Sequence, residues 1–192
     1  MRKRREEKAL REEEAQSDLK PQLENAREFP LKECWITADW ADGGLGGLVN
    51  VVVSRERPDK KIIAASFLLD VYCLGLKDGL YKVGLSKSKS AKLVDKVFSH
   101  TEAEKCSPEL AHQMVYECID YAAQFGFEPH KDFEIAQYVL QPRGTLDTPH
   151  DITFGKDGKP FYVNGPYDDV DAILAKLNKN PGKGNYTFLS VM

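Results

Sequence analysis

Three aspartates flank two apolar segments and could together hold a metal ion. Asp39 and Asp42 stand beside a glycine-rich stretch, and Asp70 ends the run 62–70, in which seven of nine residues are apolar. If these segments are the first and third strands of an antiparallel meander, Asp39 and Asp70 lie at the same sheet edge, about 10 Å apart. Mg²⁺ and Mn²⁺ prefer oxygen ligands, so the three carboxylates predict a metal site. The alternative is that Asp39 and Asp42 serve the turn and Asp70 caps the strand exit.

Two further groups could assist chemistry at such a site. His130 stands two residues before Asp132, a spacing that allows a general base with an orienting carboxylate, or else Asp132 caps a following helix. Cys73 precedes Lys77, whose charge would lower the pKa of the thiol, although a buried structural cysteine explains the same residue. The candidate catalytic residues are Asp39, Asp70, Lys77 and His130.

A lysine-rich segment is the best candidate for contacts with phosphate groups. Its lysines alternate with serines, and Asp95 is the acid that offsets them locally. Such a segment suits the backbone of a nucleic acid, whereas the alternative is a solvated loop and helix face. The lysines are Lys82, Lys87, Lys89, Lys92 and Lys96.

Composition limits the class of protein. The chain has 192 residues with a net charge of -3, which argues against a strongly basic nucleic-acid binder. The four cysteines show no close pairing, so reduced thiols are expected rather than a zinc knuckle or a disulfide framework. Neither a secretory leader nor an apolar run long enough for a membrane span is evident. These features predict a cytoplasmic protein.

The elements that must position these residues follow from hydrophobic patterns. Strands are expected at 34–40, 48–55 and 62–72, and their short connections predict an antiparallel three-stranded meander. The nearly continuous apolar run in the third strand is typical of a strand covered on both faces. A glycine-punctuated loop is expected after it.

Helices are expected at 91–98, 108–125 and 131–140. The second is the clearest, because Ser107 is a good N-cap, Pro108 suits the first helical position and Gly126 suits the end. A last helix carries Val170 to Leu177, and a closing strand is expected at 186–191.

A β-hairpin is predicted around the dipeptide Asp157-Gly158, which favours a two-residue type I′ turn. Pairing outward from this turn sets Phe154 opposite Phe161 and Ile152 opposite Val163 on one buried face. The whole chain is thus predicted to be α+β: the meander, then helices, this hairpin, a helix and a closing strand.

The first thirty residues differ from the rest. Opposite charges recur four residues apart in 1–20, with no apolar stripe, which favours a solvated helix or a disordered tail. We therefore expect a charged N-terminal arm at 1–30 and a single α+β domain at 31–192.

The segments 70–78, 126–130 and 164–169 resemble ones in uncharacterised bacterial proteins of unknown function. The resemblance covers most of residues 33–192. It favours a bacterial cytoplasmic protein and implies no activity or site.

No catalytic signature is complete in the sequence, which has no phosphate-binding glycine loop, serine-nucleophile motif or zinc-protease motif. The leading hypothesis is therefore a binding or accessory module that contacts a nucleic acid or a protein partner. The alternative is a nuclease or phosphodiesterase that depends on Mg²⁺ or Mn²⁺ at Asp39, Asp42 and Asp70.

Overall fold

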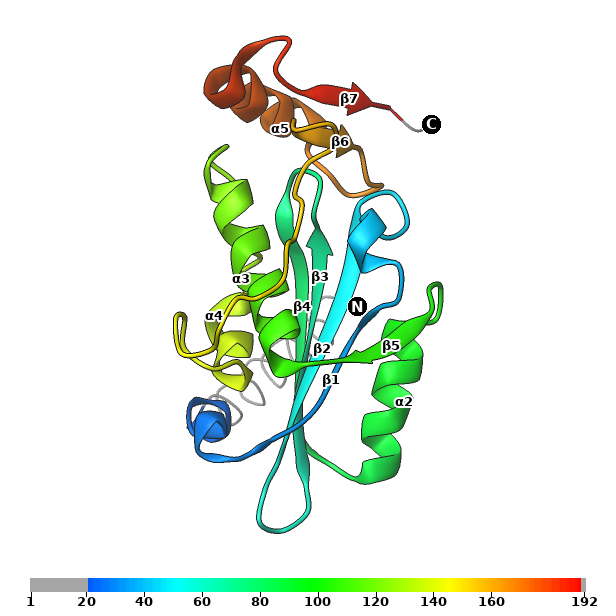
Figure 1. The fold of residues 1–192 in the computed structure, drawn as a ribbon, viewed down its shortest axis with the longest axis vertical. Coiled ribbons are helices and arrows are strands. Elements are labelled where there is room, and N and C mark those ends of the chain that lie inside the picture. The colour runs from blue at the N-terminus through cyan, green and yellow to red at the C-terminus, as the bar shows by residue number, and fades with distance from the viewer. Residues whose placement is uncertain (1–20, 191–192) are drawn as a thin grey trace, which may run out of the picture.

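The computed structural model describes residues 21–190 and shows a mixed α+β fold (Figure 1). Its centre is a five-stranded antiparallel sheet in the order β4-β3-β2-β1-β5. The strands are β1 Leu31–Thr37, β2 Leu48–Glu56, β3 Ile62–Asp70, β4 Gly75–Leu85 and β5 Ala103–Cys106. The predicted meander is confirmed as β1, β2 and β3.

Strand β3 is covered on both faces, as its apolar run predicts. Ile62 and Ala64 pack with Leu93 of helix α2 (Lys87–Val97) on one face. Ile63 and Phe67 belong to the main core on the other face, under helix α3 (Pro108–Ala123). Alternate residues of a strand point to opposite faces of the sheet. A strand that is buried on both faces therefore shows no alternation of polar and apolar residues.

Two helices cover the two faces of the sheet (Figure 1). Helix α2 spans Lys87–Val97 and α3 spans Pro108–Ala123. The predicted start of α3 is confirmed, since the Ser107 hydroxyl accepts a hydrogen bond from the Leu110 N–H at 3.1 Å. The shorter elements are the 3₁₀ turns η1 Ala26–Glu28, η2 Trp40–Asp42 and η3 Gln137–Val139, and the helix α4 Phe133–Ala136.

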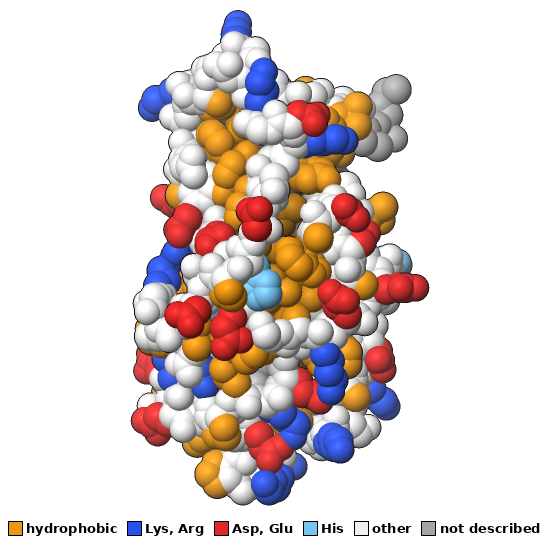
Figure 2. Space-filling view, viewed as in Figure 1, with side chains coloured by type: hydrophobic (Ala, Val, Ile, Leu, Met, Phe, Trp, Pro, Cys, Tyr) orange, Lys and Arg blue, Asp and Glu red, His pale blue; other side chains and the backbone are white. Residues whose placement is uncertain are grey.

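The C-terminal segment forms a small unit at one end of the sheet (Figure 1). It contains β6 Phe161–Val163, α5 Val170–Leu177, the π-helical turn η4 Asn178–Gly182 and β7 Thr187–Leu189. Tyr162 and Leu177 are fully buried here and share a second core with Cys73 and Phe127. Hydrophobic side chains gather over the junction between this unit and the sheet in Figure 2.

The predicted hairpin is wrong beyond its turn. Lys156 and Lys159 form an isolated antiparallel bridge around the turn, but β6 pairs in parallel with β7, so that Phe161 faces Thr187. Phe154 instead stacks on Tyr121, with ring centroids 5.6 Å apart. The packing of Phe154 on Tyr121 of α3 therefore replaces the expected strand pairing beyond the turn.

Two strands were not expected from the sequence. β4 occupies the segment around Gly75, Gly79 and Gly84, which was expected to be a loop. β5 pairs with the free edge of β1. Glycine disfavours strands only weakly, and pairing along the whole buried strand β3 overrides that preference.

Residues 21–30, expected in the charged arm, pack on the domain. Leu23 and Ala26 are fully buried in the main core, and the Arg27 guanidinium donates to the Leu140 carbonyl at 2.9 Å. The prediction for residues 1–20 lies outside the described residues.

Candidate functional site

A β-bulge in β4 changes the direction of two charged side chains. Leu69 of β3 faces Leu76, but the next partner pair is Leu68 with Asp78, so Lys77 is the extra residue. A bulge re-aims the side chains on its strand. Asp78 consequently shares the α2 side of the sheet with Leu68, while the Lys77 ammonium reaches the C-terminal unit, where it contacts Asp168 at 3.1 Å.

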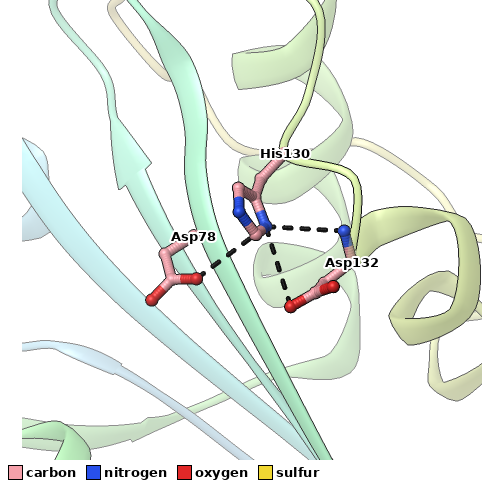
Figure 3. A group of neighbouring side chains, drawn as sticks. All are labelled: Asp78, His130 and Asp132. Atoms are coloured by element: carbon pink, nitrogen blue, oxygen red, sulfur yellow. Dashed lines mark hydrogen bonds and ion pairs between the residues drawn. The ribbon is translucent and has the colours of Figure 1, made fainter. Parts of the chain in front are cut away.

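Asp78 meets two residues from a loop that follows α3. The His130 Nδ1 lies 3.8 Å from the Asp78 Oδ1 and 3.8 Å from the Asp132 Oδ2. The three side chains point toward one another in Figure 3, from β4, the loop and the start of α4. The His130 backbone N–H donates to the Leu76 carbonyl at 3.0 Å, which ties the loop to β4 beside the bulge.

The spacing of this cluster suits a metal ion. One ligand atom from each residue lies within 4.8 Å of the others. Atoms that bind one ion at about 2.0–2.2 Å lie about 3.0–4.4 Å apart, so small side-chain movements suffice. The Asp132 backbone N–H donates to the His130 Nδ1 at 3.4 Å. This contact uses the single lone pair of that nitrogen, so an ion bound at Nδ1 would have to replace it. The competing interpretation is a structural cluster, in which these contacts only tie the loop to β4.

The cluster borders a groove of about 470 Å³ on the α2 side of the sheet. Helix α2 covers Ile62 and Ala64 on this face of the sheet. The next two residues of β3 on the same face, Ser66 and Leu68, line the groove. The groove is lined by Asn50, Ser66, Leu68, Asp78, Gly79, Leu80, Lys96, Val97 and Asp132. It therefore brings carboxylates, a hydroxyl, an amide and an ammonium to one surface.

The structure does not bring Asp39, Asp42 and Asp70 together as a group of ligand atoms within the described residues. Asp39 and Asp42 are exposed beside the turn η2. Asp70 is 5% exposed, and its Oδ1 accepts the backbone N–H groups of Tyr72 and Cys73 at 3.0 Å each. The strand-capping alternative thus describes the geometry of Asp70.

Electrostatics agree with a structural role for the turn after β3. Burial raises the pKa of the Asp70 carboxyl to about 6, although Lys77 and the backbone N–H groups oppose this effect. Burial, together with the neighbouring Asp70, also raises the pKa of the Cys73 thiol well above its ordinary value. Lys77 acts to lower the pKa of this thiol, but less than burial raises it, so the fully buried Cys73 fits the interpretation of a structural cysteine.

The other predicted residues divide into two groups. Of the catalytic candidates, His130 lies in the new cluster, and Lys77 is committed to Asp168, which also accepts the Tyr162 hydroxyl at 3.2 Å. Of the five lysines, Lys82 lies on β4 and the other four lie on α2. All five are exposed, and Lys96 lines the groove.

Asp78 is the site residue that sequence reasoning did not select. Its neighbours Lys77 and Gly79 suggested a loop, and strand alternation in 76–83 is interrupted by the bulge. His130 and Asp132 could be paired from the sequence, because they lie two residues apart and that separation suggested that the two side chains act together.

Comparison of the chain with protein-family models, curated proteins and solved structures found no match. Within residues 21–190, helices long and apolar enough to cross a membrane are absent.

Proposed function

We propose that this protein is a binding module that holds a divalent cation at Asp78, His130 and Asp132 and uses it to bind nucleic acid in the adjacent groove. The observation that carries the proposal is that Lys96 lines the same groove as Asp78 and Asp132. A cation and an ammonium that face one groove provide the two charges that commonly hold phosphate oxygens.

The donor set favours Mn²⁺ or Zn²⁺ over Mg²⁺. Imidazole suits transition metals, whereas Mg²⁺ favours oxygen ligands and retains water. Three protein ligands leave further positions on a six-coordinate ion to water or phosphate oxygens. We therefore place the proposed metal site at the cluster beside the bulge and not at Asp39, Asp42 and Asp70.

Lysines on α2 extend the positive charge away from the groove. Lys89, Lys92 and Lys96 are spaced by three and four residues, so they share one helix face, and each is exposed. A row of exposed lysines that leads to a phosphate site supports a nucleic-acid strand over a protein partner, because phosphates repeat along the strand.

Mn²⁺ is expected to raise the melting temperature of the protein. At about 100 times its Kd, the ion adds about 2.7 kcal/mol to the free energy of unfolding, or about 5–10 °C for a chain of this size. Differential scanning fluorimetry with Mn²⁺, Zn²⁺ and Mg²⁺ measures the shift. Asp78→Asn and Asp132→Asn should each remove it.

The matched control for this test is Asp42→Asn, which changes an exposed aspartate from the set that the sequence suggested. This variant should keep the full shift. A shift that survives Asp78→Asn but disappears in Asp42→Asn would contradict the proposed ligands. The absence of any Mn²⁺ shift would contradict the proposed cation site and leave the structural interpretation of the cluster.

Nucleic-acid affinity is expected to fall steeply with salt. Each phosphate contact contributes a slope of about -0.7 to -0.9 to the plot of log K against log salt concentration, so Lys96→Ala should make that slope shallower by about one contact. Fluorescence anisotropy with a labelled oligonucleotide measures it, with exposed Lys183→Ala as control. Binding that is independent of salt, or equal slopes in both variants, argues against this groove.

A metal-dependent phosphodiesterase is the second proposal. It is favoured by the exposure of the cluster, since the Asp78 side chain is 66% exposed and leaves room for a metal-bound water. Hydrolysis of bis(p-nitrophenyl) phosphate that requires Mn²⁺ and is lost in Asp132→Asn would favour it. Binding of nucleic acid without hydrolysis favours the binding module.

A further inference from the structure

The floor of the groove beside the cation cluster carries two polar side chains that the proposed function does not use. They are Asn50 of β2 and Ser66 of β3. In the sheet, Leu68 pairs with Asn50 on one side and with Asp78 on the other. Ser66 pairs with Leu80 of β4. Residues that pair across strands point to the same face, so all of these side chains belong to one surface, the groove floor.

The hydroxyl of Ser66 is open to the groove although the residue is buried. Ser66 is 8% exposed, and its Oγ makes no hydrogen bond to residues 21–190. In that part of the chain, four side-chain polar atoms are both unbonded and closed off from solvent, and the Ser66 Oγ is not among them. Its remaining accessible surface therefore faces the groove that the residue lines. A buried hydroxyl in this position favours a ligand that hydrogen-bonds to it.

The side-chain amide of Asn50 is available in the same way. Asn50 is half-buried, and its amide makes no hydrogen bond within the described part of the chain. Its backbone N–H donates to the Thr37 Oγ1 at 2.9 Å, which helps to fix the residue on β2. A planar amide offers an acceptor and two donors, the combination that pairs with the edge of a nucleobase. A serine hydroxyl suits the edge of any base.

The rest of the floor suits the flat face of a base. Leu68, Leu80 and Val97 supply apolar surface around the two polar groups. The volume of about 470 Å³ is within the usual range for sites that enclose a small ligand. In a duplex, the faces of a base are stacked and its pairing edge is occupied. An unpaired base, in contrast, exposes both its faces and its edge to a protein.

The spacing of the polar groups matches the order of groups in a nucleotide. Asp78, a proposed ligand of the cation, lies two strand spacings from Asn50, or about 10 Å, with Leu68 between them. A phosphate held at the cation would therefore be separated from the Asn50 amide by the apolar floor. In a nucleotide, the sugar and the body of the base likewise separate the phosphate from the polar edge.

We propose that the groove holds one unpaired nucleotide, so that the nucleic acid bound by this protein is single-stranded. This inference rests on the proposed function, because the cation and Lys96 hold the phosphate. The base lies against Leu68 and Leu80, and its edge hydrogen-bonds the Asn50 amide and the Ser66 hydroxyl.

Fluorescence anisotropy of three labelled probes with the full-length protein in Mn²⁺ tests this inference. The probes are a short single-stranded oligonucleotide of mixed sequence, an abasic strand of the same length and the matching duplex. We expect the single strand to bind about tenfold more tightly than either of the others. Asn50→Ala and Ser66→Ala should each weaken its binding by about three- to tenfold and leave the abasic strand unaffected. Thr153→Ala, which removes an exposed hydroxyl outside the groove, is the control and should change none of the three affinities.

The probes separate a failure of this inference from a failure of the proposed function. Equal affinities for the single strand and the abasic strand, or tighter binding of the duplex, would overturn the unpaired nucleotide. The proposed function would survive that result if Lys96→Ala still weakened the binding of the probes. If none of the three probes binds, both proposals fail. The comparison of probes on the wild type does not depend on the folding of any variant.

The base contacts are tested by the two variants. Thermal denaturation checks that Asn50→Ala and Ser66→Ala keep the fold. If both folded variants bind the single strand as tightly as Thr153→Ala does, the assigned contacts to the base are wrong.

Discussion

Replacing Gly75 with alanine is expected to lower the free energy of unfolding by about 3–4 kcal/mol. Gly75 begins β4 with a φ of +72°, a conformation that L side chains rarely adopt. An added Cβ would also lie 2.6 Å from the Ala122 Cβ and 3.2 Å from the Cys118 carbonyl oxygen. Both contacts belong to α3, which is packed in the core and cannot retreat without opening it.

Gly84→Ala is the matched control for this prediction. Gly84 lies near the other end of β4 with a similar φ of +70°, but an added Cβ would have no atom within 4 Å. Its substitution should cost about 1 kcal/mol, which is the backbone contribution alone. Urea denaturation of both variants measures the difference. Equal losses would show that the contact between β4 and α3 is not as close as described.

Asp70→Asn is expected to stabilise the protein at pH 7 by about 3 kcal/mol. Burial raises the pKa of Asp70 from 3.8 to about 6 in the folded protein. A folded-state pKa above the unfolded value means that ionisation costs stability, and that this cost grows as the pH rises from about 4 to about 6. The amide oxygen of asparagine can still accept the Tyr72 and Cys73 N–H groups.

The stability gain should therefore vanish near pH 4, where Asp70 is protonated. Urea denaturation of wild type and Asp70→Asn between pH 4 and pH 7 measures this difference. A loss of stability in the variant at pH 7 would show that the charged carboxylate is needed in the turn. A gain that is independent of pH would show that the carboxylate does not titrate in this range.

His112 changes the free energy of unfolding in the opposite direction to Asp70, over nearly the same pH range. Burial lowers the pKa of His112 from 6.5 to about 4. Its ring is held neutral, because Nδ1 bonds the Pro108 carbonyl and Nε2 accepts the Gln141 N–H at 2.8 Å. Its contribution to stability, about 3 kcal/mol, is lost as the pH falls from about 6.5 to about 4. The wild type thus changes less with pH than Asp70→Asn does.

Local signals in the sequence were sufficient for elements whose own residues decide their structure. The start of α3 follows from Ser107 and Pro108, and the burial of β3 on both faces follows from the run 62–70. The turn at Asp157-Gly158 also forms, with Asp157 at a φ of +53°. In each case the interaction that determines the structure lies within a few residues.

Elements that depend on distant partners could not be predicted in this way. β4 is a strand because it pairs along β3, although Gly75, Gly79 and Gly84 favour a loop. The hairpin fails because Phe161 contacts Tyr72 at a centroid distance of 6.0 Å and β6 pairs with β7. These outcomes depend on long-range packing that no local pattern contains.

The candidate site also combines a contact that is local in the sequence with one that depends on distant residues. His130 and Asp132 are close in the chain, so their pairing was visible in the sequence. Asp78 joins them through the bulge at Lys77 and the hydrogen bond from His130 to Leu76, both of which need the assembled sheet. Asp70 was selected for its position at a strand end, where its carboxylate turns inward to cap the turn.

Asp78, His130 and Asp132 are the proposed ligands of one cation. Anomalous diffraction from crystals of the protein grown with Mn²⁺ tests this most directly, because it locates the ion itself. We expect a peak about 2.0–2.3 Å from a carboxylate oxygen of Asp78, a ring nitrogen of His130 and a carboxylate oxygen of Asp132. A Mn²⁺ peak elsewhere in the protein, with none at these three residues, would contradict it.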